Sequence, residues 1–185
     1  ILEEQYISPP FLGWVGRLFV EHDRRESAAD VLATLRERVN EGNLSDQAAL
    51  HLLQGEIELQ EGRAEEAVDL FRLACQLRRD AISLDSLARG QLALGQLQEA
   101  ATSYEESIAL RDLGWEGQEY WLLAPLKLGK VFEELGDFER AAGSYRDFLR
   151  IWEAGDEDLV DLAEAERRLE ALRAPRAGGG ERGPR

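Results

Sequence analysis

Few side chains in this sequence are of the types that most often carry out chemistry. It has two histidines, His22 and His51, and one cysteine, Cys75. Neither histidine has a Cys, His or carboxylate at a spacing typical of metal ligands, so we expect surface or half-buried side chains. Cys75 lies on an apolar helical face, where we expect a buried and unreactive thiol. A single cysteine also excludes an internal disulfide.

Carboxylates are plentiful, and several stand next to each other along the chain. Neighbours in a helix point about 100° apart, so such pairs do not form a close catalytic dyad. We expect them to lie on solvated helix faces: Glu65–Glu66, Glu105–Glu106 and Glu133–Glu134.

Other catalytic patterns are also missing from the sequence. It has no phosphate-cradling loop, nucleophile elbow or Cys–His pair, and the Gly178–Gly180 run follows no strand. We therefore predict that the chain is not an enzyme and that it has no catalytic residue, metal site or cofactor.

The composition is that of a folded, acidic chain. Hydrophobic residues make up 44% of the 185 positions, and the formal net charge is −15. A chain with this negative charge repels phosphate backbones and anionic lipid. We therefore exclude nucleic acid and membranes as partners. It favours partners with basic or mixed faces, although a solvated exterior alone also explains it.

The ends and composition of the chain suggest where it comes from. The sequence begins with Ile1, contains no Met and has no signal peptide or membrane-length apolar run. We expect a cytoplasmic piece of a longer protein, whose missing N-terminal part has room for a targeting signal or a catalytic domain. All basic residues are Arg except Lys127 and Lys130, which with many Ala and Gly favours a GC-rich bacterial genome.

A helix-turn-helix pattern recurs four times along the sequence. The two best copies read GQLALGQLQEAATSYEESIAL from Gly90 and LGKVFEELGDFERAAGSYRDFLRI from Leu128, and earlier copies begin at Leu52 and Phe11. In each copy, apolar residues at helical spacing lead to a turn residue and then to a second helix with a small residue and an aromatic or leucine. The turn residues are Asp23, Gly62, Gly95 and Gly136.

This pattern resembles the tetratricopeptide repeat family over about residues 9–153. The resemblance implies an all-α, right-handed α-solenoid of about four helical hairpins. We assign residues 1–8 to an N-terminal extension, 156–173 to a capping helix and 174–185 to a disordered tail. The repeats fall at about 9–42, 48–80, 81–112 and 122–153, with loop insertions at Asn40–Asp46 and Arg111–Tyr120.

In this family the first helices of successive repeats line a concave groove that holds a partner peptide. The matching positions in this chain are the candidate partner-binding residues: Trp14, Arg17, Leu52, Glu56, Asp85, Arg89, Leu126, Lys127 and Lys130.

Cations occupy equivalent places in three of the four repeats. Arg17, Arg89 and Lys130 hold the same register position, and Lys127 lies three residues before Lys130. These cations predict a groove that binds an acidic segment or a C-terminal carboxylate of a partner. The alternative is that they are solvated charges, with Lys130 supported by Glu134 at helical spacing.

Two features of the third junction have more than one interpretation. The aromatic segment Trp115–Trp121 could form a second contact surface, but we favour packing at a junction or at an extended helix start. Pro125 belongs either in the first turn of the next helix or inside a longer, kinked one.

We predict a non-catalytic protein–protein interaction scaffold, either a monomer or docked to a missing domain. Two other functions remain open. One is a regulatory or ligand-sensing arm of a larger bacterial kinase or transcription regulator, which would show a closed apolar pocket instead of an open groove. The other is a structural assembly subunit, associating through the weak first repeat near Phe11 and Trp14.

Overall fold

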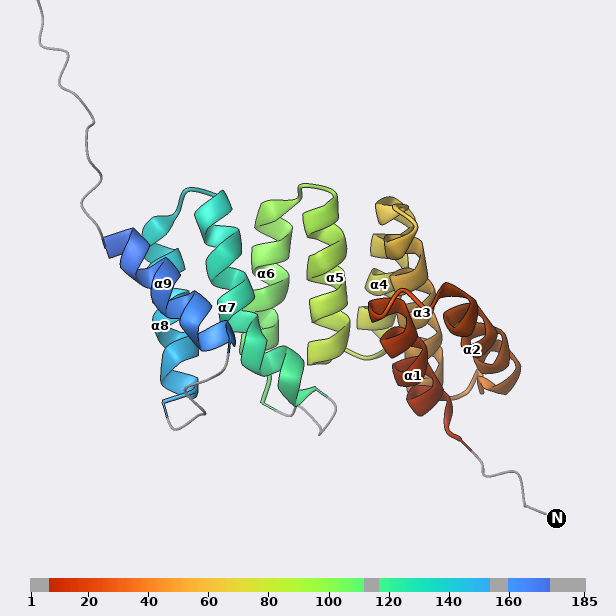
Figure 1. Ribbon diagram of the computed structural model, residues 1–185. Helices are drawn as coiled ribbons and strands as arrows, with labels where there is room; N and C mark the ends of the chain where they lie inside the picture. The colour runs from red at the N-terminus through yellow and green to blue at the C-terminus, as the bar shows by residue number, and fades with distance from the viewer. Residues whose placement is uncertain (1–6, 112–116, 154–159, 174–185) are drawn as a thin grey trace, which may run out of the picture. The chain divides into compact units, whose positions relative to one another are not determined.

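The structure is a computed structural model that describes residues 7–111, 117–153 and 160–173. Within these ranges the chain forms nine helices and no strand, which confirms the predicted all-α class (Figure 1). The helices are α1 (Pro9–Glu21), α2 (Arg25–Arg38), α3 (Leu44–Gln60), α4 (Ala64–Leu77), α5 (Ala81–Ala93), α6 (Leu97–Ile108), α7 (Gln118–Glu134), α8 (Phe138–Ile151) and α9 (Val160–Arg173).

The chain divides into two compact units, Ile1–Ala124 and Pro125–Arg185, and each is described by itself. In the first unit α1 packs against α2 and α3, α3 packs against α4, and α5 packs against α4 and α6. Helices α1, α3 and α5 therefore form a row, which we call the first-helix row. In the second unit α9 packs against α8, with Ala165 and Leu169 of α9 buried.

Four helix pairs reverse direction through the same kind of turn. The residue that leaves the first helix has a positive φ of 54° at Asp23, 80° at Gly62, 71° at Gly95 and 74° at Gly136. The next backbone N–H then bonds to the carbonyl five residues back, as Gln96 does to Gln91 at 2.9 Å and Asp137 to Phe132 at 2.9 Å. This bond satisfies a carbonyl that the helix end would otherwise leave unpaired, and it fixes the reversal.

Small residues allow the two helices of a pair to approach closely, as the sequence predicts. A Cβ added to Gly55 would lie 2.5 Å from the ring of Phe71, and one added to Gly129 would overlap the ring of Tyr145. Phe71, Tyr104 and Tyr145 are all at most 1% exposed. The rings of Phe71 and Tyr145 thus fill the core beside glycines, which have no side chain.

Two helix starts differ from the predicted repeat boundaries. Helix α3 begins at Leu44 because the Asn43 side chain accepts hydrogen bonds from the backbone N–H groups of Ser45 and Asp46. The predicted loop Asn40–Asp46 is therefore partly helical. Helix α7 begins at Gln118, so Pro125 lies inside a long helix and not in its first turn.

The aromatic segment of the third junction is helical from Gln118 onward. Trp121 lies on α7, and its Nε1 donates a hydrogen bond to the Ile108 carbonyl at 3.1 Å. This contact supports the packing interpretation of the segment. Trp115, like the predicted start of the capping helix at residues 156–159, lies outside the described residues.

Two glycines in the second unit test the turn argument. Gly136 sits at φ 74° with no atom within 4 Å of an added Cβ, so Gly136→Ala costs only backbone strain, about 1–2 kcal/mol. Gly143 lies inside α8 with equal space, and Gly143→Ala should stabilise the fold by about 1 kcal/mol. The urea concentration at the midpoint of unfolding should therefore fall for Gly136→Ala and rise for Gly143→Ala. Midpoint shifts of the same sign would contradict the turn geometry.

Candidate partner-binding face

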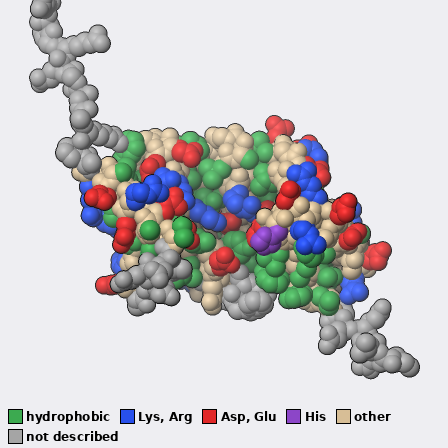
Figure 2. All heavy atoms as spheres, in the orientation of Figure 1, with side chains coloured by type: hydrophobic (Ala, Val, Ile, Leu, Met, Phe, Trp, Pro, Cys, Tyr) green, Lys and Arg blue, Asp and Glu red, His purple; other side chains and the backbone are tan. Residues whose placement is uncertain are grey.

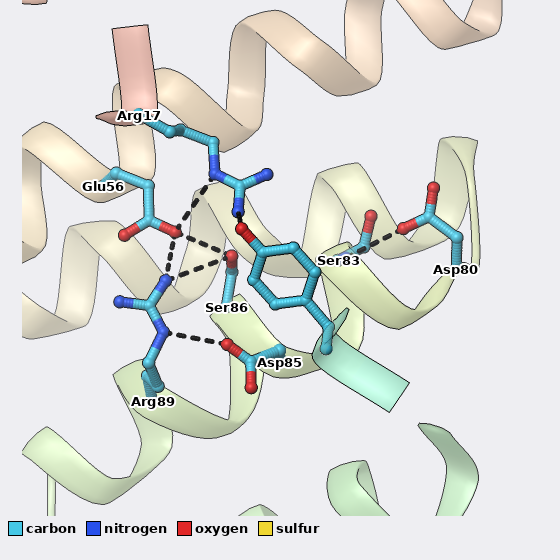
Figure 3. A network of polar contacts seen from close by, with 8 residues as sticks. Arg17, Glu56, Asp80, Ser83, Asp85, Ser86 and Arg89 are labelled. Atoms are coloured by element: carbon cyan, nitrogen blue, oxygen red, sulfur yellow. Dashed lines mark hydrogen bonds and ion pairs between the residues drawn. The ribbon is translucent and has the colours of Figure 1, made fainter. Parts of the chain in front are cut away.

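Four of the nine candidate residues meet on the first-helix row. Arg17 on α1, Glu56 on α3 and Arg89 on α5 each follow a small residue that packs inward, so they lie at the same register position of their helices. Asp85 lies one turn before Arg89 on α5. Figure 3 shows the four side chains pointing toward one another.

Glu56 is the centre of this cluster. Its Oε1 accepts hydrogen bonds from Arg89 Nη2 and, at 2.7 Å, from the hydroxyl of Ser86, and it lies 3.8 Å from Arg17 Nε. Arg89 Nε donates to Asp85 Oδ2 at 3.1 Å. Two carboxylates and two guanidinium groups therefore form one connected network, which we call the charge cluster.

The charge cluster is largely closed to solvent. The side chains of Arg17 and Glu56 are each 6% exposed and that of Asp85 is 2% exposed, whereas Arg89 keeps 35%. Burial opposes the charge on Arg89, but Glu56 and Asp85 outweigh it and raise its pKa above the ordinary value. Three of these four candidates thus serve the packing of the helices, and only Arg89 is open to a partner.

Tyr120, which we did not include among the candidate residues, completes the cluster. It lies in the first turn of α7, accepts a hydrogen bond from Arg17 Nη2, and its ring centre lies 5.1 Å from the Arg17 guanidinium carbon. Burial raises the pKa of Tyr120, Arg17 lowers it, and Glu21, Asp85 and Glu119 raise it. The only sequence signal for Tyr120 was its place in the aromatic segment.

An open apolar hollow lies beside the charge cluster. It is bounded by α1, α3 and the start of α5, with side chains of Phe11, Trp14, Ala48, Ala49, Leu52 and Ile82 among its walls. Phe11 and Trp14 are 45% and 38% exposed, and their rings lie 5.5 Å apart. Figure 2 shows hydrophobic side chains gathered over α1. The structure thus places two further candidates, Trp14 and Leu52, at this hollow.

The remaining candidates belong to the second unit. Leu126 is 2% exposed and therefore part of the core. Lys130 Nζ lies 2.8 Å from Glu164 Oε2 on α9, so its carboxylate partner is Glu164 and not the predicted Glu134. Lys127 is half-buried on α7 and has an interaction partner of its own.

Glu133 also departs from the prediction that paired carboxylates are only solvated. It accepts a hydrogen bond from the Tyr145 hydroxyl and another from Arg168 Nη1 at 3.2 Å. Glu164 in turn lies 2.8 Å from Arg168 Nε. Glu133 and Glu164 therefore connect α9 to α7 and α8 within the second unit.

The cysteine and the two histidines lie on different elements: Cys75 on α4, His22 at the end of α1 and His51 on α3. Cys75 is buried, and burial raises the pKa of its thiol to about 12, so it stays protonated and unreactive at neutral pH. His22 is exposed and His51 is half-buried, and burial lowers the pKa of His51. Across the described ranges, no three His, Cys, Asp or Glu side chains are grouped as metal ligands would be. None of the described helices combines the length and apolar character needed to span a bilayer.

Comparison with known proteins agrees with the helical pattern. A family model for the tetratricopeptide repeat matches residues 16–82 and 86–156. A search of curated proteins finds no match. Among solved structures, a Podosopora anserina chain described as a kinesin light chain with nearly identical TPR-like repeats aligns with a TM-score of 0.65 and 17% identity. The alignment covers 90% of this chain and 87% of that one.

A second crystal structure, of a single-substitution variant of that kinesin light chain, gives the same result. Its TM-score is 0.64 at 17% identity, again over 90% of this chain and 87% of the other. At this identity the likeness concerns the fold, which is that of a TPR-like helical solenoid.

Removing the central charge tests the charge cluster. Glu56→Gln keeps the shape of the side chain but leaves the buried Arg17 without its carboxylate, so we expect a loss of about 3 kcal/mol of unfolding free energy. Glu65→Gln, on the exposed first turn of α4, is the control and should change stability by less than about 0.5 kcal/mol. Equal urea midpoints for the two variants would show that Glu56 does not hold the row together.

Glu164 predicts a pH dependence for the second unit. Hydrogen bonds from Lys130 and Arg168 lower the pKa of Glu164 below its ordinary 4.5. Its contribution is therefore present above pH 4.5 and is lost as the pH falls through the lowered value in the folded state. Glu164→Gln should lower the melting temperature at neutral pH, with the difference from the parent shrinking in acid, whereas the exposed Glu170→Gln should show no such trend.

Proposed function

Because the chain belongs to the tetratricopeptide repeat family, we propose that it is a non-catalytic module that binds a protein partner along its first-helix row. The family match and the TPR-like fold support a protein-interaction scaffold in general. The fold is also that of a repeat scaffold that is typically not catalytic.

The observation that carries the proposal is the hollow beside α1 and α3. It opens to solvent at Phe11 and Trp14, two large side chains that remain 45% and 38% exposed. Exposed aromatic residues grouped around a concave apolar surface are typical of interaction sites. An open hollow of this kind fits a scaffold better than a ligand sensor, for which we expect a closed pocket.

The acidic-partner hypothesis stays a prediction, and the ion pairs weaken its premise. Arg17 and Arg89 pair with Glu56, Arg89 also pairs with Asp85, and Lys130 pairs with Glu164. An acidic segment or C-terminal carboxylate would therefore compete with carboxylates that the chain itself supplies. Nucleic acid remains a poor partner for a chain of net charge −15.

Photo-crosslinking tests whether partners bind on the first-helix row. A benzoylphenylalanine replaces Trp14 in one variant and Leu73, which is 43% exposed on α4 and does not line the hollow, in another. In lysate of the source organism, we expect a covalent adduct with another protein from position 14 and none from position 73.

Three other outcomes would each change the conclusion. Adducts from position 73 alone would move the interface to the second helices. Adducts only with a second copy of the chain would favour the assembly subunit. No adduct from either position, with both variants folded, would contradict the proposed function.

A further inference from the structure

The hollow on the first-helix row exists because its floor is built from small side chains. Ser45, Ala48 and Ala49 of α3 line it together with Gly13 of α1, and a Cβ on Gly13 would already lie 3.0 Å from the Ala49 Cβ. The two helices therefore meet closely at these small residues, and the longer side chains of Phe11, Trp14 and Leu52 stand around the space. Leu52 and Ile82 close the far side, so the walls are largely apolar.

The guanidinium groups at this face are already engaged by carboxylates. Arg17, which lines the hollow, pairs with Glu56 at 3.8 Å, and Arg78 at its rim pairs with Asp80 at 2.7 Å. Arg89 pairs with Glu56 and Asp85. A carboxylate arriving from outside would have to displace one of these partners.

Two exposed carboxylates lie near Arg17, which lines the hollow. Glu21 follows Arg17 by four residues, one turn of α1, and Glu119 adjoins Tyr120, which accepts a hydrogen bond from Arg17. Both carboxylates also raise the pKa of Tyr120. Neither carboxylate has an ion pair with any residue of the described ranges. The whole chain adds a field of net charge −15 that attracts cationic partners.

The apolar and acidic parts lie on one face of α1 at a defined spacing. Trp14 and Glu21 are seven residues apart, two helical turns, so they lie on the same side of α1 and about 10 Å apart along its axis. An extended peptide covers that distance in about three residues.

We propose that the occupant of this face is a basic peptide segment of the partner protein, a chemistry that rests on the proposed function. A large apolar side chain of the segment sits in the hollow against Trp14. A Lys or Arg about three residues away pairs with Glu21 and Glu119. The apolar contact supplies most of the affinity. The charge pairing makes the face prefer basic over acidic peptides and speeds their association.

A random peptide display library, selected on the folded chain, provides the probe. Enriched sequences should carry net positive charge and an apolar residue spaced about three positions from a Lys or Arg. A fluorescein-labelled copy of the most enriched peptide is then titrated by fluorescence anisotropy. Trp14→Ala should weaken its binding roughly tenfold or more. Leu73→Ala, which removes an equally exposed apolar side chain outside the hollow, should leave binding unchanged.

A variant that fills the hollow should also weaken peptide binding. Ser45→Leu adds an apolar side chain at the wall and should weaken binding, while the Asn43 cap still accepts from the backbone N–H of residue 45. Melting curves of Trp14→Ala and Ser45→Leu are the control, and they should show that both variants are folded when they lose peptide binding.

A second pair of variants isolates the charge contribution. Glu21→Gln/Glu119→Gln should weaken binding and flatten its dependence on salt. Glu65→Gln/Glu66→Gln removes the same net charge from the exposed first turn of α4 and should have a much smaller effect. Equal effects would show that only the net charge matters, which would overturn the pairing with Glu21 and Glu119.

Other outcomes separate this inference from the proposed function. Enriched peptides of net negative charge would overturn it and would favour the acidic partner. Binding unchanged by Trp14→Ala would overturn it by showing that the peptide does not use the hollow. No enrichment together with crosslinking from position 14 would show a folded partner surface, so the inference would fail while the proposed function stands. Failure of both experiments would contradict both proposals.

Discussion

The first-helix row depends on one buried carboxylate between two guanidinium groups. Removing Glu56 and Arg17 from water costs several kcal/mol for each ion, and their attraction offsets this cost only when the geometry is well defined. The Glu56 Oε1 accepts hydrogen bonds from Arg89 and Ser86, whereas it lies 3.8 Å from Arg17 Nε, which pairs with it by charge alone and has no hydrogen-bond partner. Any slip of α1 or α5 along α3 would separate these charges. The charge cluster therefore fixes the register of three helices that come from three different sequence repeats.

This internal use of charge determines what the face can offer to a partner. Arg17, Arg78 and Arg89 already pair with carboxylates of the chain, whereas Glu21 and Glu119 are exposed. The apolar hollow lies next to them because Gly13, Ala48 and Ala49 leave space that longer side chains would fill. Tyr120 of α7 adds a further contact to the cluster by accepting a hydrogen bond from Arg17. Recognition then depends on an apolar anchor and on the sign of the neighbouring charge.

The sequence predicts the helix pairs well because their signals are local. A positive φ at Gly62, Gly95 and Gly136 requires only the glycine itself, and Asp23 adopts the same conformation at the equivalent place. The helix starts were less well predicted where a side chain acts on its neighbours, as Asn43 does in extending α3 to Leu44. The sequence did not decide where α7 begins, because the aromatic residues at its start suit both a helix and a loop.

The contacts of the candidate site were not predictable in the same way, since they join residues far apart in the chain. Register identified Arg17, Glu56 and Arg89 as equivalent, but it treated each as a separate groove position. The sequence did contain a hint, because the equivalent positions of three successive repeats carry the signs plus, minus and plus. Stacked helices bring such positions together, so alternating signs form ion pairs, whereas a binding stripe needs the same sign throughout. Lys130 continues the series with a positive charge, and its carboxylate comes instead from Glu164 on α9. In a helical repeat protein, the charge of a groove residue is therefore best judged against its equivalents in neighbouring repeats before it is assigned to a ligand.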